Sequence, residues 1–390
     1  MKILVVTHDS NFSGGANRSL YMVLTKLKKE YNVDIDVLLP SKKGELNKKL
    51  DEAGIHWFSY KYFGVVSGIR KDGKDFLRIF KVYIGYIIEH FLAIYLSHKL
   101  KKDNYDLVYT NTRLPIVGAK IAKRLSVPHI CHVREFGTVK PLWGWWKHKD
   151  IYRMSSRVIC ISQSLANTFT EKVPNDKIVT IYNGIDSPLN LPKSYNSKSK
   201  ELNIIIVGRL VPDKGQDEAI RAISILKDRN IKNIKLHIVG SSPKRTHISW
   251  YEENLKKMVD DLNLNEFVEF HGEIKNMTNI RKNMDIELMC AICETFGRVT
   301  VEAMRSGLLV IGTNTGATPE IINDGRTGML YEQGNAESLA DKIEKVYKNK
   351  KECQKIVDQG YDFSQVNYTP DKNVKEIYDV MIEVLDEKGK

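Results

Sequence analysis

The sequence has few cysteines and no disulfide pattern. Its five cysteines in 390 residues are an odd number without framework spacing, which excludes a small secreted domain held together by disulfides. The first residues, MKILVVTHDS, predict a strand and lack the layout of a signal peptide. We therefore expect a protein of the reducing cytoplasm.

Long apolar runs are also missing. No stretch reaches the roughly 20 residues that a membrane-spanning helix needs. The nearest candidate, Val82 to Leu96, is shorter and contains Glu89 and His90, so we predict a helix buried within the protein. Any contact with a membrane is then peripheral.

Metal-ligand spacing is scarce as well. Cys290 and Cys293 form one C-x-x-C, but no second pair and no nearby histidine completes a zinc set, so we interpret both as structural. Asp34 and Asp36 match a D-x-D pattern, but they lie inside a predicted strand. The sequence therefore predicts no bound metal.

What the chain does have is a repeated alternation of apolar strands and helical patterns, over a length that favours two domains. The first half contains the runs KILVVT, VDIDVLLP, YDLVYT, PHICHV and RVICIS, and the second half contains LNIIIVG, IKLHIVG, FVEFHG, IELMCAI and LLVIGTN. Such alternation predicts an α/β chain with a parallel sheet and covering helices in each half.

A segment without an apolar period separates the halves. Residues 187–200 are rich in Pro, Ser, Asn and Lys and predict a linker. It divides an N-terminal Rossmann-like domain over residues 1–186 from a C-terminal one over 201–365, and residues 366–390 predict a final helix with one apolar stripe. Ligands bind beyond the carboxyl ends of parallel strands, so we expect the two sheets to face each other across a cleft.

Positive charge is concentrated in the first half. Residues 1–186 hold 30 Lys and Arg against 17 Asp and Glu, a net charge of +13, whereas residues 187–390 carry −1. A field of one sign attracts an anionic partner, such as a phospholipid surface, a lipid phosphate or a nucleic acid. None of the recognisable nucleic-acid-binding modules appears, so we expect no nucleic-acid partner.

Two loops at predicted strand ends suit phosphate groups. Ser13-Gly14-Gly15-Ala16 follows the first strand and opens a helix, which presents bare backbone N–H groups to a phosphate or a sugar, although a simple tight turn explains the glycines equally well. In the second half, Arg209 and Lys214 lie between a strand and its helix, where two cations can bind a diphosphate unless they are solvated surface charges.

The most informative segment is ETFGRVTVEAM. Glu294 lies in the loop before a predicted helix start at Phe296-Gly297, and Glu302 lies about two turns inside that helix. A loop carboxylate and a helix carboxylate can accept hydrogen bonds from two different sets of sugar hydroxyls, while the free N–H groups at the helix start meet a phosphate.

This arrangement resembles the retaining family 4 glycosyltransferases of the GT-B fold, whose hallmark is E-x7-E. The likeness covers nearly the whole chain and rests on several ordered motifs: SGGA, TIYNGID, GRLVPDKG, IVGSS, FHGEI, ETFGRVTVEAM and GTNTGATPEIINDGRTGMLY. The resemblance implies two Rossmann-like domains facing across a cleft, with the C-terminal helix packing back towards the first.

The resemblance also implies roles for individual residues. Arg209 and Lys214 would bind the diphosphate of a nucleotide-sugar donor, with uridine as the default base, Glu294 would bind the transferred sugar, and Glu302 the ribose. Backbone contacts would come from Phe296, Gly297, Gly14 and Gly15. The family implies retention of anomeric configuration without a metal or other cofactor, the leaving diphosphate itself taking the acceptor proton.

Two places depart from the family pattern. Ile292-Cys293 stand where a Pro-Ser pair commonly precedes the first glutamate. The family often has an active-site histidine after an N-domain strand, and HICHVREFG offers His132 or, nearer the strand end, Arg134 and Glu135. His132 alternates within the strand, so an active-site role and a core role both remain open.

Basic and aromatic residues mark a candidate acceptor side in the first half, although a solvated charged face and a loop core would explain them too. They form two clusters. One, Lys140 to Lys149, combines three tryptophans with basic residues, and amphipathic rings favour membrane boundaries. The other consists of Lys61, Arg70, Lys71, Lys74, Arg78 and Lys81, interleaved with Tyr60, Tyr62, Phe63, Phe76 and Phe80.

Together these features predict a glycosyltransferase, hexosyltransferase-like and metal-independent, that acts on a lipid-linked or growing cell-surface glycan. We expect it in the cytoplasm, at the inner face of the cell membrane if it contacts anionic lipid. The alternatives are a non-catalytic GT-B partner subunit of another transferase, or a sugar-nucleotide epimerase or phosphorylase on the same fold. Retention of Arg209, Lys214, Glu294 and Glu302 favours the enzyme over the partner subunit.

Overall fold

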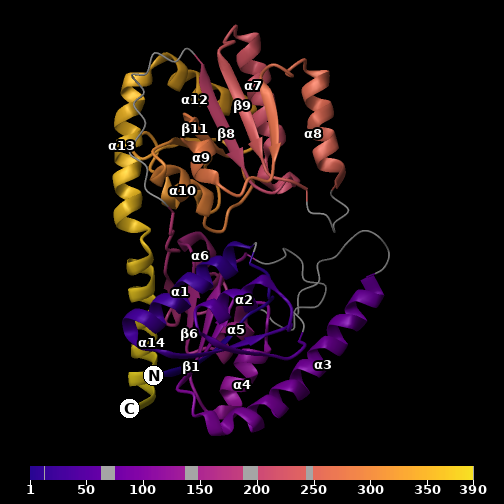
Figure 1. Ribbon diagram of the computed structural model, residues 1–390, viewed down its shortest axis with the longest axis vertical. Helices are drawn as coiled ribbons and strands as arrows, with labels where there is room; N and C mark the ends of the chain where they lie inside the picture. Colours follow the sequence, from indigo (N-terminus) through magenta and orange to yellow (C-terminus); the bar gives the residue numbers. More distant parts are fainter. Residues whose placement is uncertain (13, 63–74, 137–147, 188–200, 243–248, 390) are drawn as a thin grey trace. The chain divides into compact units, whose positions relative to one another are not determined.

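The computed structural model describes residues 1–12, 14–62, 75–136, 148–187, 201–242 and 249–389. They form two compact units: unit 1 comprises Met1–Gly184 and Pro370–Lys390, and unit 2 comprises Ile185–Thr369 (Figure 1). All but the first residue of the predicted linker lies outside the described residues. The chain returns to unit 1 at Pro370, so the last helix belongs to the first unit.

Unit 1 is built on a parallel sheet of seven described strands in the order β3-β2-β1-β4-β5-β6-β7. The order reverses between β1 and β4, which makes the loops after these two strands the switch point of the sheet. The strands are β1 (Lys2–Val6), β2 (Asp34–Leu39), β3 (His56–Ser59), β4 (Leu107–Asn111), β5 (His129–Val133), β6 (Arg157–Cys160) and β7 (Ile178–Thr180). The helices are α1 (Gly15–Tyr31), α2 (Glu45–Glu52), α3 (Asp75–Leu100), α4 (Val117–Leu125), α5 (His148–Met154), α6 (Gln163–Thr170) and α14 (Pro370–Gly389), with a short 3-10 turn, η1 (Lys101–Asp103).

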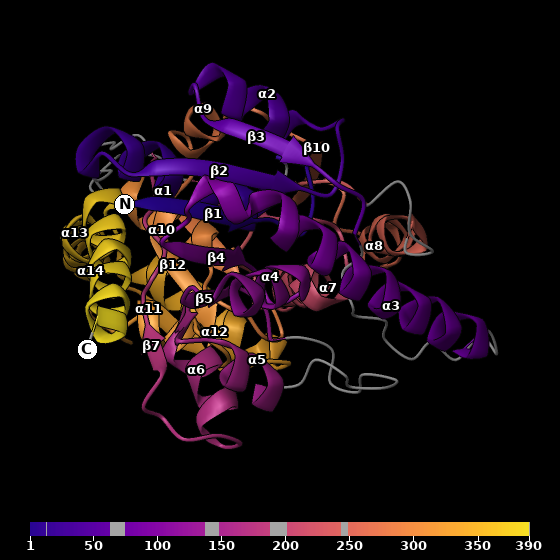
Figure 2. The same cartoon turned by 90° about the horizontal axis from the view of Figure 1, so that it is seen from below.

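The C-terminal helix α14 packs on α1 in unit 1, as both views show (Figures 1 and 2). Its apolar stripe places Val374, Ile377 and Met381 in the core that β1 and α1 form, and all three are fully buried. Burying one such side chain contributes about 1.5–3 kcal/mol to folding. This stripe is why the last 20 residues fold with the first unit rather than with their neighbours in sequence.

The prediction that the helix over Val82 to Leu96 is buried within the protein is wrong for one side of α3. One side of α3 packs on α4 and buries Glu89 and Ala93, but the other side is open. In Figures 1 and 2 its first turns extend beyond the other elements of unit 1. No described helix, α3 included, is long and apolar enough to cross a bilayer.

Unit 2 repeats the design with six described strands in the order β10-β9-β8-β11-β12-β13, all parallel. The switch point lies between β8 and β11. The strands are β8 (Leu202–Val207), β9 (Ile234–Val239), β10 (Val268–Gly272), β11 (Ile286–Met289), β12 (Leu309–Thr313) and β13 (Met329–Tyr331). The helices are α7 (Gln216–Asp228), α8 (Ser249–Asp261), α9 (Met277–Arg281), α10 (Arg298–Arg305), α11 (Thr318–Ile321), α12 (Ala336–Lys348) and α13 (Lys350–Asn367), with the 3-10 turn η2 (Pro212–Lys214). Two parallel-sheet Rossmann-like units confirm the predicted fold class.

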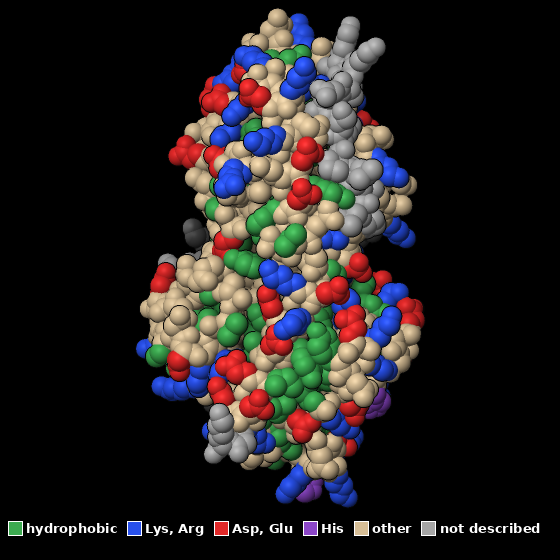
Figure 3. All heavy atoms as spheres, turned by 90° about the vertical axis from the view of Figure 1, so that its left-hand side faces the viewer, with side chains coloured by type: hydrophobic (Ala, Val, Ile, Leu, Met, Phe, Trp, Pro, Cys, Tyr) green, Lys and Arg blue, Asp and Glu red, His purple; other side chains and the backbone are tan. Residues whose placement is uncertain are grey.

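On part of the surface, positive side chains are mixed with negative ones. On the face that Figure 3 shows, Lys and Arg side chains are interspersed with Asp and Glu. On α14 itself, Lys375 pairs with Asp379, and Asp371 pairs with Lys26 of α1. Such exposed pairs contribute little to stability, but they leave no one-signed patch there.

Candidate active site

Three of the sequence-predicted residues of unit 2 lie on the loops at its switch point, and two of them, Lys214 and Glu294, are in contact. Arg209 and Lys214 follow β8, and Glu294 follows β11, the neighbouring strand. In open parallel sheets the ligand binds where the loops of two such strands separate. The fold therefore brings together two loops that are about 80 residues apart in sequence.

The two loops are locked to each other through their backbones. Gly215, which ends η2 and begins α7, has φ +67°, and a Cβ atom there would lie 2.1 Å from the carbonyl oxygen of Cys290. The Ile292 N–H also donates to the Asp213 carbonyl at 3.0 Å. Only glycine permits this approach. The GRLVPDKG motif therefore supplies two cations and also the glycine that lets the two loops come close together.

Lys214 and Glu294 form an ion pair, Nζ to Oε1, in the space between the loops. Both side chains are partly open to solvent, at 27% and 17% exposure. Arg209, also exposed, lies at the start of the same loop. A ligand can exchange partners with such a pair: the ammonium can bind a phosphate while the carboxylate accepts hydrogen bonds from hydroxyl groups.

The helix that follows Glu294 begins at Gly297, which has φ +87° and caps α10 without any side-chain hydrogen bond. The Thr300 and Val301 N–H groups donate to the Gly297 carbonyl, at 3.1 and 3.4 Å, and so close the first turn of α10 on its cap residue. Phe296 is buried and packs edge-on against Tyr368 with ring centroids 5.7 Å apart. Its side chain therefore anchors the loop before α10.

Glu302 is held by a residue that the sequence analysis did not select. Arg281, at the end of α9, donates from Nη1 to the Glu302 carboxylate at 3.3 Å. The same guanidinium binds both oxygens of Glu287, on β11, at 2.8 and 2.9 Å. Arg281 and Glu287 are almost fully buried, and Arg298 also approaches Glu302, at 3.7 Å. Glu302 is thus oriented by a buried ion pair beneath it.

Replacing Arg281 by methionine is expected to destabilise the protein by about 3–5 kcal/mol, because Glu287 would be left as a buried charge without its partner. The free energy of unfolding, measured by denaturant titration, checks this. The double variant Arg281→Met with Glu287→Leu should recover most of the loss. A single variant as stable as the wild-type protein would contradict this account of the pair.

Unit 1 presents its own polar cluster at the ends of β1, β4 and β5. Gly14 caps α1 in an extended conformation without a side-chain hydrogen bond, and nothing lies within 4 Å of where its Cβ would be. Gly15 is the first residue of α1, and the Arg18 N–H donates to the Gly14 carbonyl at 3.3 Å. Arg134 donates to Asn111 and to Asn183, in each case at 2.6 Å.

His132, the candidate of the sequence analysis, lies inside β5 and is fully buried. Its Nδ1 bonds to the Tyr109 hydroxyl, and an Arg134 nitrogen lies 3.4 Å away. Burial and the Arg134 charge hold the pKa of His132 well below its usual value, so the ring is neutral. Arg134, at the strand end, stands nearer to where a ligand binds.

Glu135 has the properties of a pH-sensitive group. Burial raises the pKa of its carboxyl group to about 7, although the Arg113 N–H donates to it at 3.0 Å. Protonation therefore favours the folded state: this contribution is complete below the unfolded pKa of about 4.3 and is lost as the pH rises through about 7.

We accordingly expect Glu135→Gln to be more stable than the wild-type protein at pH 8, by about 2 kcal/mol, and of similar stability at pH 4. Urea titrations of both proteins at the two pH values measure the difference. Glu332→Gln, which alters an exposed carboxyl, serves as the control. An equal difference at both pH values would show that the buried charge is not the cause.

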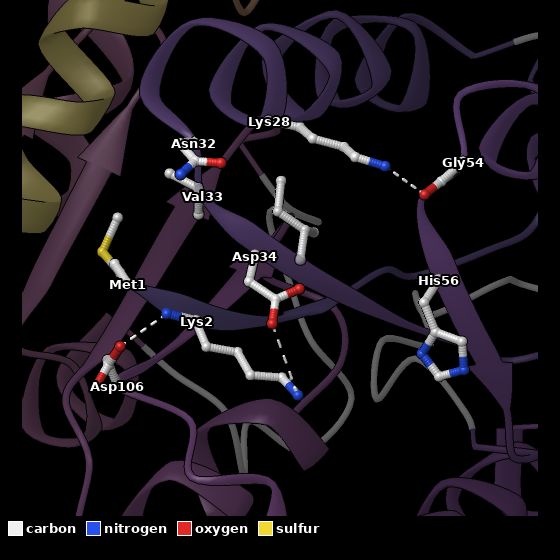
Figure 4. Close-up of a pocket in the computed structure, with 10 residues that line it drawn as sticks. Met1, Lys2, Lys28, Asn32, Val33, Asp34, Gly54, His56 and Asp106 are labelled. Atoms are coloured by element: carbon white, nitrogen blue, oxygen red, sulfur yellow. Dashed lines mark hydrogen bonds and ion pairs between the residues drawn. The ribbon is translucent and has the colours of Figure 1, made fainter.

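A surface pocket of about 600 Å³ lies elsewhere in unit 1 (Figure 4). It is lined by Met1, Lys2 and Asp34 at the amino ends of β1 and β2, opposite the edge where ligands bind such sheets. Asp36, of the D-x-D pattern, is buried and binds the Tyr105 hydroxyl and His56 Nδ1, each at 2.6 Å. Because the pocket lies at the amino ends of the strands, it is not the candidate active site.

Two Rossmann-like units, with a cationic and carboxylate site at the switch point of the second, define the GT-B class of transferases. The match to solved structures agrees: a glycosyltransferase from Rickettsia africae has a TM-score of 0.80 at 22% identity, over 98% of each chain. HepE from Anabaena, solved in complex with UDP, has a TM-score of 0.78 at 20% identity, over 98% of this chain and 100% of that one.

The family models agree with this class. "Glycosyltransferase Family 4" matches residues 13–187, and "Glycosyl transferases group 1" matches residues 189–363. The N-acetyl-alpha-D-glucosaminyl L-malate synthase of Bacillus anthracis is 25% identical over 79% of this chain and 76% of that protein. CapM of Staphylococcus aureus, a capsular polysaccharide biosynthesis glycosyltransferase, is 29% identical over 48% and 51%. The chain belongs to the family 4 glycosyltransferases and is an enzyme of that type.

Proposed function

We propose that this protein is a retaining glycosyltransferase that moves a sugar from a UDP-sugar to a lipid-linked or growing cell-surface glycan. The observation that carries the proposal is the Lys214–Glu294 pair at the switch point between β8 and β11. It combines, in one place, a group for the diphosphate and a group for the sugar hydroxyls.

The main electrostatic requirement of the reaction is to stabilise the leaving diphosphate. As the bond from the sugar C1 to the phosphate oxygen breaks, negative charge grows on that oxygen, and Arg209 and Lys214 stabilise it. Glu294 accepts hydrogen bonds from hydroxyls of the transferred sugar, and Glu302, oriented by Arg281, does the same for the ribose.

Retention follows if the acceptor attacks from the face that the diphosphate leaves. The departing phosphate oxygen then takes the proton of the acceptor hydroxyl, so no protein base is required, and Arg209 and Lys214 take the place of a metal ion. Unit 1 binds the acceptor in this proposal, through Arg134 with Asn111 and Asn183 and through Gly14 and Gly15 at the start of α1.

The relatives support the substrate classes. HepE has been solved with UDP-glucose as well as with UDP, and CapM takes part in capsular polysaccharide biosynthesis. Both agree with a uridine diphosphate donor and a surface-glycan acceptor for this chain.

The donor is tested by a thermal-shift and hydrolysis screen of the purified protein against UDP-, GDP- and other nucleotide sugars. We expect a UDP-sugar to raise the melting temperature of the wild-type protein and to be hydrolysed slowly. Arg209→Ala should lose both effects, whereas Glu294→Ala should lose hydrolysis and keep part of the thermal shift. If no nucleotide sugar binds, a non-catalytic partner subunit becomes the better account.

A peripheral contact with anionic membrane is also proposed, now centred on α3. The open side of this helix exposes a stripe of large apolar side chains at helical spacing, which is typical of interfacial helices. Lys101 and Lys102, exposed just after the helix, can bind acidic head groups. The stripe consists of Phe80, Ile84, Ile87, Ile88, Phe91, Ile94 and Tyr95.

Only part of the earlier candidate acceptor surface can be compared. Residues 63–74 and 137–147 lie outside the described residues. Tyr62, expected on that surface, is instead buried, and its hydroxyl donates to the Thr7 and Leu38 carbonyls at 2.6 and 2.9 Å. This residue is part of the core because its ring fills the space beneath α3.

Phe91→Asp is expected to weaken binding to vesicles containing anionic lipid by about tenfold or more, since Phe91 is 64% exposed and its transfer into the interface would be lost. Vesicle co-sedimentation measures the change. Val366→Asp, which alters an equally exposed apolar residue of unit 2, should have no effect. Unchanged binding of Phe91→Asp would remove α3 from the proposal.

A further inference from the structure

Three side chains with metal-binding groups meet on one face of the unit 2 sheet. His237 lies on β9, and Glu269 and His271 lie on the edge strand β10. His237 and Glu269 are direct partners in the strand register, and His271 follows two residues later, where the register shifts between Phe270 and Gly272. One ligand atom from each of the three lies within 4.8 Å of the others.

The distances leave room for an ion between them. His237 Nδ1 and His271 Nε2 are 2.9 Å apart. Glu269 Oε2 lies 3.9 Å from His237 Nδ1, and Glu269 Oε1 lies 3.8 Å from His271 Nε2. Ligand atoms of a tetrahedral zinc ion are roughly 3.3 Å apart, given bonds of about 2.0–2.1 Å. Shifts of about half an ångström would therefore bring all three to coordination distance.

A second residue sets the tautomer of the buried histidine. His237 Nε2 lies 3.2 Å from Asn203 Oδ1 on β8, and an amide oxygen only accepts, so the proton of the neutral ring resides on Nε2. Nδ1 is then the acceptor of the hydrogen bond from His271 Nε2–H, and a bound ion would take the place of that proton. Metal-binding histidines are commonly oriented by such a hydrogen bond from the other ring nitrogen.

The Lys235 ammonium already pairs with the Glu269 carboxylate, since its Nζ lies 3.2 Å from Glu269 Oε2. Lys235 is the group that a bound cation would have to displace.

We propose that His237, Glu269 and His271 bind a divalent transition-metal ion of the zinc type. Two imidazoles and one carboxylate suit such ions, whereas calcium and magnesium prefer oxygen ligands alone. The ion joins the edge strand β10 to β9 and leaves a fourth position to water. It lies on β9 and β10, not on the loops after β8 and β11 that carry Arg209 and Glu294, so it is no part of the glycosyl transfer proposed above.

The test is a titration of the full chain with Zn²⁺ by calorimetry and with Co²⁺ by visible absorption. The Cys293→Ser variant is the background, because Cys293 is an exposed thiol that binds zinc on its own account. We expect one ion per chain, with a cobalt spectrum of low coordination number. Zn²⁺ should also raise the melting temperature, since it binds only the folded arrangement.

The variants separate this site from adventitious binding. His271→Ala and Glu269→Gln, both at partly exposed positions, should weaken binding by at least about tenfold, as should Asn203→Ala through the orientation of His237. Lys235→Met should tighten binding by removing the competing ammonium. His98→Ala, an exposed histidine of α3, is the matched control and should bind like the background.

Absence of stoichiometric binding in the Cys293→Ser background would overturn the proposal. So would equal affinity in His271→Ala and Glu269→Gln while circular dichroism shows that both are folded. None of these readouts depends on catalysis, so failure here and failure of the glycosyl transfer proposal are distinguishable.

Discussion

Glu294→Gln is expected to lower kcat/KM for sugar transfer about a thousandfold, with little change in the affinity for free UDP. Glu294 pairs with the Lys214 ammonium and, in the proposed function, accepts hydrogen bonds from sugar hydroxyls, so the amide would lose both an ion pair and a charge-assisted acceptor. Steady-state transfer with the donor found by the screen, together with UDP calorimetry, measures both quantities.

The matched control is Glu273→Gln, which alters a carboxylate in the loop after β10 that binds the Ser241 hydroxyl at 2.6 Å. It should transfer at the wild-type rate. If Glu294→Gln lost UDP affinity and transfer in equal measure, Glu294 would act on the nucleotide rather than the sugar. Full activity would remove it from the site altogether.

Arg209→Met and Lys214→Met should each reduce kcat by about 10²–10³-fold and weaken UDP binding as well, because each removes a cation from the developing diphosphate charge. The two effects should be less than additive, since both cations act on one group. Binding of uridine, which has no phosphate, should be unaffected in either variant. Calorimetry with UDP and with uridine, beside transfer rates, makes the comparison.

Lys214→Arg tests geometry at constant charge. Lys214 is a compact point charge at the end of η2, and the planar guanidinium is larger, so we expect partial activity rather than rescue. Lys232→Met, which removes an exposed lysine of unit 2, should leave UDP binding unchanged. Equal UDP affinity in all these variants would show that the diphosphate binds elsewhere.

Much of the unit 2 site could be predicted from sequence because its parts are local. The Gly-rich loop, the cations and the E-x7-E pair each occupy a short segment next to an apolar strand, and parallel sheets collect strand ends at one edge. Arg281 could not be found in this way. It lies 21 residues before Glu302, on a short helix without any motif, and only the packing of α9 against β11 brings it there.

Unit 1 was predicted less well for a related reason. The alternation of HICHV correctly predicts β5, but period two does not reveal which side of a strand is covered when both sides are buried. His132 therefore remained ambiguous until the structure placed it beside Tyr109 in the core. Asn111, the last residue of β4, and Asn183, which lies beyond the end of β7, bind Arg134 but were not selected, because asparagine is common in ordinary turns.

The sequence by itself determined two α/β units with parallel sheets, the family, and the short segments that carry the candidate site residues, because these depend on local periodicity and on loops that follow strands. Only the tertiary structure decided that α14 folds with unit 1, that one side of α3 is left uncovered, and that Arg281 supports Glu302. It also placed His237 beside Glu269 and His271, through a strand register that no sequence spacing encodes. Contacts between distant segments depend on which faces remain free after packing, and that is a property of the whole fold.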